Sequence, residues 1–234
     1  FVGDDVSRLY RRPSSFAPRT RLVVTEQTSN LGGGAIWPLE QLEGVAKTAQ
    51  DLGLSVHMDG ARALNASVAT GIDLSTYANH HDSAWLAFTK GLGCPVGAVL
   101  AGSREFIRQA WHFKRMFGGA MRQTGVLTAM CLYALDHHVD RLAEDHARAK
   151  RIEMALKKCE LFCQVYPADT NIVLAEINPR FGITAPELKA FLAVQNVQVM
   201  AVGAQKIRMI THLNVDDLAV ESLLVGVDSF LESI

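Results

Sequence analysis

The chain lacks any long uninterrupted run of apolar residues, and its charges almost cancel. Its 234 residues include 23 Lys and Arg against 24 Asp and Glu, which leaves a formal net charge of −1. No stretch is apolar for long enough to span a bilayer, and no signal-peptide pattern opens the chain. Basic residues alternate with acidic ones, so we expect neither a nucleic-acid nor a membrane partner.

Cysteine is also scarce. The four cysteines are Cys94, Cys131, Cys159 and Cys163, and none of them forms a C-x-x-C pair. This usage is typical of reduced thiols in a cytoplasmic protein. Cys159 and Cys163 have no matching His or Asp partner nearby, so we expect no metal site.

The first half of the chain alternates short apolar runs with one clear amphipathic segment. Strands are expected over 22–25, 55–58, 84–89 and 97–102, and the 3.6-residue spacing of apolar residues predicts a helix over 38–52. Strands and helices in this order indicate an α/β fold with an open, mostly parallel sheet. Ligands of such sheets bind beyond the carboxyl ends of the strands.

The pattern changes in the second half. A helical stretch over 124–158 is interrupted near His137 and His138. Short strands and helices follow; strands are expected over 172–177, 197–202 and 207–211, and helices over 186–195 and 216–231. This order indicates a small α+β domain, so we expect one domain over 1–145 and a second over 146–234.

Three charged residues follow apolar runs of the first half, namely Glu26, Asp59 and Lys90. A lysine at the end of a buried strand has a lowered pKa, which makes its amine a nucleophile toward aldehydes. A strand-end carboxylate can keep a pyridine nitrogen protonated, so Asp59 and Lys90 together suit pyridoxal 5'-phosphate. The alternatives are a salt bridge between two strand ends, or two unrelated solvated charges.

Five collinear motifs make the chain resemble the low-specificity threonine aldolases, which are pyridoxal-phosphate enzymes of fold-type I, the aspartate aminotransferase-like superfamily. The motifs are Glu26-Gln27-Thr28-Ser29-Asn30 with the glycines after it, His57-Met58-Asp59-Gly60-Ala61-Arg62, Thr89-Lys90-Gly91-Leu92-Gly93-Cys94-Pro95-Val96-Gly97, Gly118-Gly119-Ala120-Met121-Arg122-Gln123, and Arg208-Met209-Ile210-Thr211-His212. The resemblance covers nearly the whole chain. It implies that residues 1–145 are the C-terminal portion of a cofactor-binding large domain and that 146–234 form the small domain.

The resemblance assigns a role to each of five residues. Lys90 is the catalytic residue, which forms the Schiff base with the cofactor, and Asp59 pairs with the pyridine nitrogen. Arg62 lies near both the cofactor and the substrate carboxylate. Arg208 binds that carboxylate, as a planar guanidinium can through two parallel hydrogen bonds, and Asn30 lines the substrate pocket. The alternatives are a helix N-cap for Asp59, a surface position for Arg62 and an edge-strand charge for Arg208.

Other residues are expected to support this site. His57 precedes Asp59 by two positions, so in a strand both side chains face the same way. His57, Glu26 and Thr28 are expected to order the pocket, although His57 could instead fill the core. The resemblance further implies that the turn of Gly118 and Arg122 contributes to cofactor binding, through backbone amides and charge, in a neighbouring subunit.

The implied reaction is aldol cleavage of a β-hydroxy-α-amino acid, in which threonine or allo-threonine gives glycine and acetaldehyde. The implied partners are a small-molecule substrate and further copies of the chain, in a homodimer or homotetramer. A β-eliminating lyase, an aminotransferase and an inactive fragment remain alternatives. The resemblance also implies a segment before Phe1 with a phosphate-binding Ser-Gly-Thr turn and a ring-stacking histidine.

Overall fold

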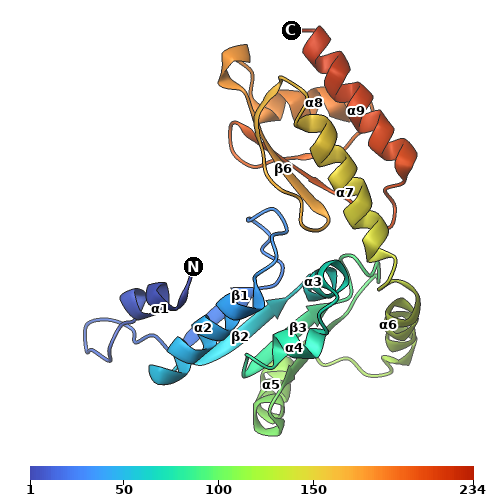
Figure 1. The fold of residues 1–234 in the computed structure, drawn as a ribbon. Coiled ribbons are helices and arrows are strands. Elements are labelled where there is room, and N and C mark those ends of the chain that lie inside the picture. Colours follow the sequence, from blue (N-terminus) through green and yellow to red (C-terminus); the bar gives the residue numbers. More distant parts are fainter. The chain divides into compact units, whose positions relative to one another are not determined.

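The computed structural model describes residues 1–234 and divides them into two compact units (Figure 1). The first unit contains Phe1–Thr28 and Trp37–Val139, and the second contains Ser29–Ile36 and Asp140–Ile234. The division therefore falls slightly before residue 145. It also assigns a short loop from the first half of the chain to the second unit, which nothing in the sequence pattern indicates.

The first unit is built on a four-stranded sheet in the order β1-β2-β3-β4. The strands are β1 (Leu22–Glu26), β2 (Ser55–Gly60), β3 (Ser83–Ala87) and β4 (Ala98–Gly102). β1, β2 and β3 are parallel, whereas β4 is antiparallel to β3. The predicted α/β fold with a mostly parallel sheet is therefore confirmed, and the antiparallel strand is confined to one edge.

The helices of this unit follow the apolar pattern of the sequence. The predicted amphipathic helix is α2 (Leu39–Asp51), which begins after Pro38 and ends before Gly53. Val45 and Ala49 of α2 are fully buried against strand residues such as Val23 and Val56. The other helices here are α1 (Gly3–Leu9), which packs on α2, α3 (Ala63–Thr70), α4 (Leu74–Ala78), α5 (Arg104–Met116) and α6 (Gly125–His137).

The last part of this unit is much more exposed than the rest. Every residue of β4 is exposed, and α5 has no buried residue. α5 nevertheless begins with a capped turn, because Ser103 Oγ accepts a hydrogen bond from the Phe106 amide at 3.1 Å. The predicted interruption of the 124–158 helix is also confirmed: α6 ends at His137, and α7 (Leu142–Leu156) begins after a short turn.

The second unit is an α+β module around an antiparallel sheet in the order β5-β6-β8-β7. The strands are β5 (Phe162–Val165), β6 (Ile172–Ile177), β7 (Met200–Ala201) and β8 (Lys206–Ile210). α7 packs on β6, α8 (Ala185–Val194) packs on β8, and α9 (Asp217–Glu232) packs on both helices (Figure 1). A short 3₁₀ helix, η1 (Pro179–Phe181), follows β6.

The glycine-rich loop after β1 packs on this second sheet. Thr170 Oγ1 donates a hydrogen bond to the Gly34 carbonyl at 2.8 Å, and a Cβ added at Gly34 would lie 2.6 Å from that same hydroxyl. Gly34 also has a φ of +75°, which favours glycine. Gly33 and Gly34 therefore bring the loop backbone close to β6. This close packing accounts for glycine at both positions without a bound ligand.

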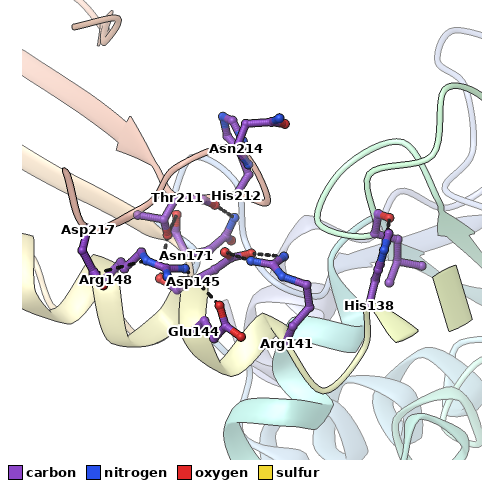
Figure 2. Close-up of polar contacts among 11 residues, drawn as sticks. His138, Arg141, Glu144, Asp145, Arg148, Asn171, Thr211, His212, Asn214 and Asp217 are labelled. Carbon is purple, nitrogen blue, oxygen red and sulfur yellow. Dashed lines mark hydrogen bonds and ion pairs between the residues drawn. The ribbon is translucent and has the colours of Figure 1, made fainter. Parts of the chain in front are cut away.

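A buried polar network joins α7 to the segment after β8 (Figure 2). Arg141 donates two hydrogen bonds to Asp145, at 2.6 and 3.2 Å, and the Asp145 side chain is fully buried. The Thr211 hydroxyl donates to the Asp145 carbonyl at 2.7 Å, and Asn171 Nδ2 donates to the Thr211 carbonyl at 2.9 Å. The network fixes the end of β8 against the first turn of α7.

Glu153 on α7 is a second buried carboxylate, and it makes stability depend on pH. Burial by itself raises its pKa, but hydrogen bonds from Lys150 (2.6 Å), Lys157 (2.5 Å) and the Ala168 amide (3.1 Å) outweigh burial and lower the pKa from 4.5 to about 2. Because the folded-state pKa is lowered, this stabilisation is complete above about pH 4.5 and is lost as the pH falls toward 2.

We expect Glu153→Gln to lower the free energy of unfolding by about 2 to 3 kcal/mol at pH 7. The difference from the unmutated chain should shrink toward zero between pH 4.5 and pH 2. Urea unfolding followed by circular dichroism measures both quantities. Glu232→Gln, at an exposed position at the end of α9, is the control; a loss at pH 7 no larger than in this control would contradict the assignment.

None of the helices combines the length and the apolar character that crossing a membrane requires.

Candidate active site

The carboxyl ends of β1 and β2 meet at one rim of the first sheet. Glu26, the last residue of β1, is in register with Asp59 on β2, and Asp59 is in register with Trp85 on β3. In-register residues of parallel strands point to the same face. The predicted juxtaposition of strand ends is therefore present, and it arises from topology because the two carboxylates are far apart in sequence.

Lys90 lies in a tight turn just beyond β3. The Gly93 amide donates to the Lys90 carbonyl at 2.9 Å, and the Phe88 amide donates to the Gly97 carbonyl at 3.0 Å. Gly97 has a φ of +127°, and a Cβ there would lie 3.0 Å from the Cys131 sulfur, so only glycine suits this closure. The turn folds the chain back on itself, and Lys90 Nζ lies 5.4 Å from the centre of the Trp85 ring.

The expectation that Lys90 is buried is wrong. β3 ends at Ala87, two residues earlier than the apolar pattern indicates, and both Thr89 and Lys90 are exposed. The last buried residue before the lysine is Phe88, which packs with Leu92 and Cys94. Burial therefore does not activate this amine within the chain, and the aromatic group beside it is the Trp85 ring.

Asp59 and His57 share one face of β2, as the alternation of the strand predicts. Both are half-buried, whereas Val56 and Met58 are buried on the opposite face. His57 Nδ1 and Ser83 Oγ are hydrogen-bonded at 2.7 Å. Burial lowers the pKa of His57, and the Asp59 charge partly opposes this change. His57 is therefore a neutral imidazole at pH 7, fixed beside Asp59 by the neighbouring strand.

The connection from β2 to α3 tests the alternative that Asp59 is a helix N-cap. Asp59 Oδ1 accepts a hydrogen bond from the Ala61 amide at 3.0 Å, while the helix N-cap is Arg62, with a φ of −133°. Asp59 is therefore not the helix N-cap, and Arg62 is not related to it by a helical turn. Arg62 is only 9% exposed, so the alternative of a surface arginine is also wrong.

The segment after β1 contributes two buried polar residues. The side-chain oxygen of Gln27 accepts a hydrogen bond from the Trp37 backbone amide at 3.1 Å. The backbone amide of Gln27 donates to the Asp59 carbonyl at 2.8 Å. Gln27 therefore fixes the backbone of both strand ends, a role that the motif alone does not indicate. Thr28 is 1% exposed, and its hydroxyl has no hydrogen-bond partner within the chain. An unsatisfied buried hydroxyl is costly, and this one lies two residues beyond the end of β1.

The second unit contains the other predicted carboxylate-binding residues. Arg208 lies on β8, which pairs with β6 on one side and β7 on the other, so the alternative of an edge-strand charge is wrong. Its side chain is 7% exposed, and Nη2 donates to Asn30 Oδ1 at 2.5 Å. Asn30 belongs to the loop that packs on this unit. The structure thus brings Arg208 and Asn30 together from opposite ends of the sequence.

The turn of Gly118 and Arg122 is exposed throughout. The Gly118 amide donates to the Arg115 carbonyl at 3.1 Å, and the Gly119 amide donates to the Lys114 carbonyl at 2.8 Å. Gly118 has a φ of +74°, as expected for a glycine that ends a helix. Both amides are thus used to close α5, and cofactor binding by this turn in a neighbouring subunit stays a prediction.

The residues at the rim fit pyridoxal phosphate in their chemistry. A primary amine (Lys90) follows one strand, a carboxylate (Asp59) lies in the last two residues of the neighbouring strand, and a buried hydroxyl (Thr28) without a partner follows the third. An amine suits the aldehyde of this cofactor, and a carboxylate suits its ring nitrogen. No group of three or more His, Cys, Asp or Glu side chains is arranged to hold a metal ion.

Trp85 is the residue of this rim that inspection of the sequence misses. The apolar run over 84–89 indicates a strand but not which side chains face Asp59. Only the pairing of β3 with β2 places Trp85 beside Asp59, and only the turn brings Lys90 over its ring. An aromatic residue five positions before a lysine in a strand-turn segment is the one signal available in the sequence.

Comparison with known proteins agrees with this geometry. The family model for beta-eliminating lyases matches residues 2–179. A probable low-specificity L-threonine aldolase 2 of Arabidopsis thaliana is 37% identical over 210 residues, which are 88% of this chain and 59% of that protein. The low specificity L-threonine aldolase of Escherichia coli K12 is 36% identical over 197 residues, or 84% of this chain and 56% of that protein. The chain thus spans little more than half the length of these relatives.

The same class of fold is found among solved structures. The threonine aldolase of Leishmania major superposes with a TM-score of 0.78 at 17% identity, covering 99% of this chain and 67% of that one. At this identity the similarity shows the fold alone, which is that of the fold-type I enzymes. Because the family model covers most of the sequence, and the strand ends hold an amine and a carboxylate as that fold requires, the chain belongs to the beta-eliminating lyase family.

Proposed function

We propose that the protein cleaves β-hydroxy-α-amino acids, such as threonine or allo-threonine, into glycine and an aldehyde with the help of pyridoxal phosphate. The observation that carries the proposal is the rim of the first sheet, where Asp59 ends one strand and Lys90 follows its neighbour. The named relatives from Arabidopsis and Escherichia coli support the aldol reaction over other chemistry of this fold.

Each residue of the rim has one task in this reaction. When bound, pyridoxal phosphate supplies an electron sink for the charge that develops at the substrate Cα. Lys90 would hold the cofactor through its primary amine, the group that suits the cofactor's aldehyde. Asp59 holds a proton on the pyridine nitrogen, and the Ala61 amide on its Oδ1 (3.0 Å) fixes the carboxylate orientation. His57, neutral and fixed by Ser83, keeps the Asp59 face of the strand polar without adding a second cation.

Residues nearer the substrate have supporting roles. Arg208 binds the substrate α-carboxylate, and its hydrogen bond to Asn30 limits the orientations of the guanidinium. Arg62, buried at the start of α3, contributes positive charge to the cofactor and the carboxylate. Glu26 and Thr28 line the end of β1, where the Thr28 hydroxyl is available as a donor. Arg122 contributes its charge from an exposed turn.

Product analysis tests the proposal directly. The chain is incubated with pyridoxal phosphate and, separately, with L-threonine, L-allo-threonine and their D-enantiomers. Aldol cleavage gives glycine and acetaldehyde in equal amounts, and the four substrates also report the stereochemical preference. Formation of ammonia and a keto acid in place of glycine would replace the proposal with β-elimination, which the name of the matching family favours as the second candidate. Transfer of the amino group to an added keto acid would indicate an aminotransferase, and no product would indicate an inactive fragment.

Asp59→Asn separates the role of the carboxylate from that of the fold. Asparagine keeps the oxygen that accepts the Ala61 amide but cannot hold the pyridine nitrogen protonated. We expect cleavage to fall by roughly 100-fold or more, with covalent capture of the cofactor by Lys90 retained. Asp51→Asn, on the exposed end of α2, is the matched control. Equal activity in both variants would remove Asp59 from the mechanism.

We further propose that the protein acts in the cytoplasm as a homodimer or homotetramer, in threonine breakdown and glycine formation. The exposed apolar side chains of α6, among them Val126, Leu132 and Tyr133, support self-association. Light scattering coupled to size-exclusion chromatography measures the mass in solution. A monomer over the concentration range of the activity assay would exclude the oligomer.

A further inference from the structure

Trp85 lies at the centre of the candidate active site although no motif includes it. It is in register with Asp59 on β2, so the two side chains emerge side by side from the same face of the sheet. The His57 and Ser83 side chains occupy the preceding register position on this face and are hydrogen-bonded to each other. Trp85 therefore extends the surface next to Asp59 onto β3, the strand that precedes Lys90.

The turn after β3 brings Lys90 back over this surface. Phe88 is bonded to both Gly97 and Cys94 through backbone hydrogen bonds, of 3.0 and 2.9 Å, so the segment is a closed loop and not an open tail. Lys90 Nζ lies 5.4 Å from the centroid of the Trp85 ring, within the range of a cation–π interaction. Trp85 is half-buried, so its ring is held by the sheet while one part remains accessible to the lysine.

We propose that Trp85 is a positioning residue for Lys90, whose indole face holds the lysine amino group at the rim beside Asp59. This inference rests on the proposed function of Lys90 and extends it. A lysine side chain has four rotatable methylene groups and a compact charge, so an exposed lysine samples many positions. A rigid aromatic face that attracts the ammonium group restricts these positions. The amine then remains near the strand-end carboxylate both before it binds an aldehyde and after a substrate amine displaces it.

Two substitutions separate the aromatic face from simple bulk. Both replacement side chains are smaller than tryptophan, but Trp85→Phe keeps an aromatic ring at the same strand position, whereas Trp85→Leu keeps an apolar side chain without a ring. The chain also offers a matched control in α5, where Lys114 Nζ lies 4.8 Å from the centre of the Trp111 ring. Trp111→Leu removes the same kind of contact from a lysine that has no proposed role.

The first measurement does not depend on the function. A trace amount of acetic anhydride acetylates lysines at a fixed pH, and mass spectrometry of the peptides gives the relative labelling rate of Lys90. Loss of the ring contact destabilises the ammonium form, so Trp85→Leu should raise Lys90 labelling by about two- to fivefold, while Trp85→Phe and Trp111→Leu stay within about twofold of the unmutated chain. Trp111→Leu should instead raise the labelling of Lys114.

The second measurement concerns position. The initial rate of covalent capture of pyridoxal phosphate by Lys90 is divided by the labelling rate of the same residue. The labelling rate depends on how much of the amine is deprotonated and on how accessible it is to the reagent. Dividing by this rate removes both effects, so the ratio reports the orientation of the amine toward the cofactor. We expect the ratio to fall by about fivefold or more in Trp85→Leu and to remain nearly constant in Trp85→Phe and Trp111→Leu. Circular dichroism spectra establish that the variants fold.

The outcomes distinguish the two proposals. If Lys90 of the unmutated chain captures no pyridoxal phosphate, the proposed function fails, and the labelling rates alone still test the contact. If capture occurs but the ratio is the same in Trp85→Leu and Trp85→Phe, the positioning role is overturned and the function stands. Lys90 labelling that does not change in Trp85→Leu, or that changes equally in Trp111→Leu, also overturns it.

Discussion

Replacing Lys90 by alanine should abolish covalent capture of pyridoxal phosphate and lower aldol cleavage by roughly three orders of magnitude. The physical reason is that no other residue of the rim supplies a primary amine: the in-register neighbours are Glu26, Asp59 and Trp85. Because Lys90 is exposed in a turn, the substitution creates no cavity, and the free energy of unfolding should change by less than about 0.5 kcal/mol. The absorbance of the bound cofactor and the rate of glycine formation measure the effect.

Lys114→Ala is the matched control for Lys90→Ala. Lys114 is also exposed and also lies over a tryptophan ring, but it belongs to α5. Capture and cleavage should remain unchanged in this variant. Covalent cofactor found on any lysine other than Lys90, or cleavage that survives in Lys90→Ala, would refute the assignment of the catalytic amine.

Replacing Asp145 by alanine should lower the free energy of unfolding by about 3 to 5 kcal/mol, which is the largest stability effect that we expect in this chain. The Asp145 side chain is fully buried and binds Arg141 through two hydrogen bonds (Figure 2). Its loss leaves a mostly buried guanidinium without a counter-charge. Because the Asp145 carbonyl accepts the Thr211 hydroxyl, disorder in the first turn of α7 should also loosen the end of β8 that carries Arg208.

Two further variants identify the cause of this loss. The double variant Arg141→Met with Asp145→Leu removes both charges, so it should recover a large part of the stability lost in Asp145→Ala. Glu105→Ala breaks the exposed pair of Glu105 and Arg108 on α5 and should cost less than about 1 kcal/mol. Chemical unfolding followed by circular dichroism measures all three. A double variant as unstable as Asp145→Ala would contradict the assignment of this loss to the unpaired charge of Arg141.

Many elements of the fold could be predicted from local pattern. The apolar period of 39–51, with Pro before it and Gly after it, defines α2, and the β-branched run at 22–25 defines most of β1. Two strands are shorter than predicted, for the same reason. The apolar run over 84–89 suggests a longer strand than β3, and the strand expected over 197–202 is reduced to the two residues of β7, Met200–Ala201. Strand ends depend on pairing partners, which a single segment does not contain.

The features of the site are likewise of two kinds, those that follow from local spacing and those that depend on distant segments. Spacing correctly places His57 and Asp59 on one face of β2, because the alternation of a strand is local. Spacing does not predict that Arg62 is buried, that Lys90 is exposed, or that Gly33 and Gly34 pack on β6, because each depends on chain segments distant in sequence. The contact between Asn30 and Arg208 is the extreme case, since it joins the first strand-end loop to the last strand.

The amino-acid sequence by itself determined many of the strands and helices, the α/β and α+β character of the two halves, and the presence of a lysine and a carboxylate suited to an aldehyde cofactor. These features follow from residue type and from spacing within short segments. Tertiary structure alone decided that Trp85 lies beside Asp59 under the Lys90 amine, and that Asn30 holds Arg208. The physical reason is that strand register and loop closure are fixed by hydrogen bonds and packing between segments far apart in the chain.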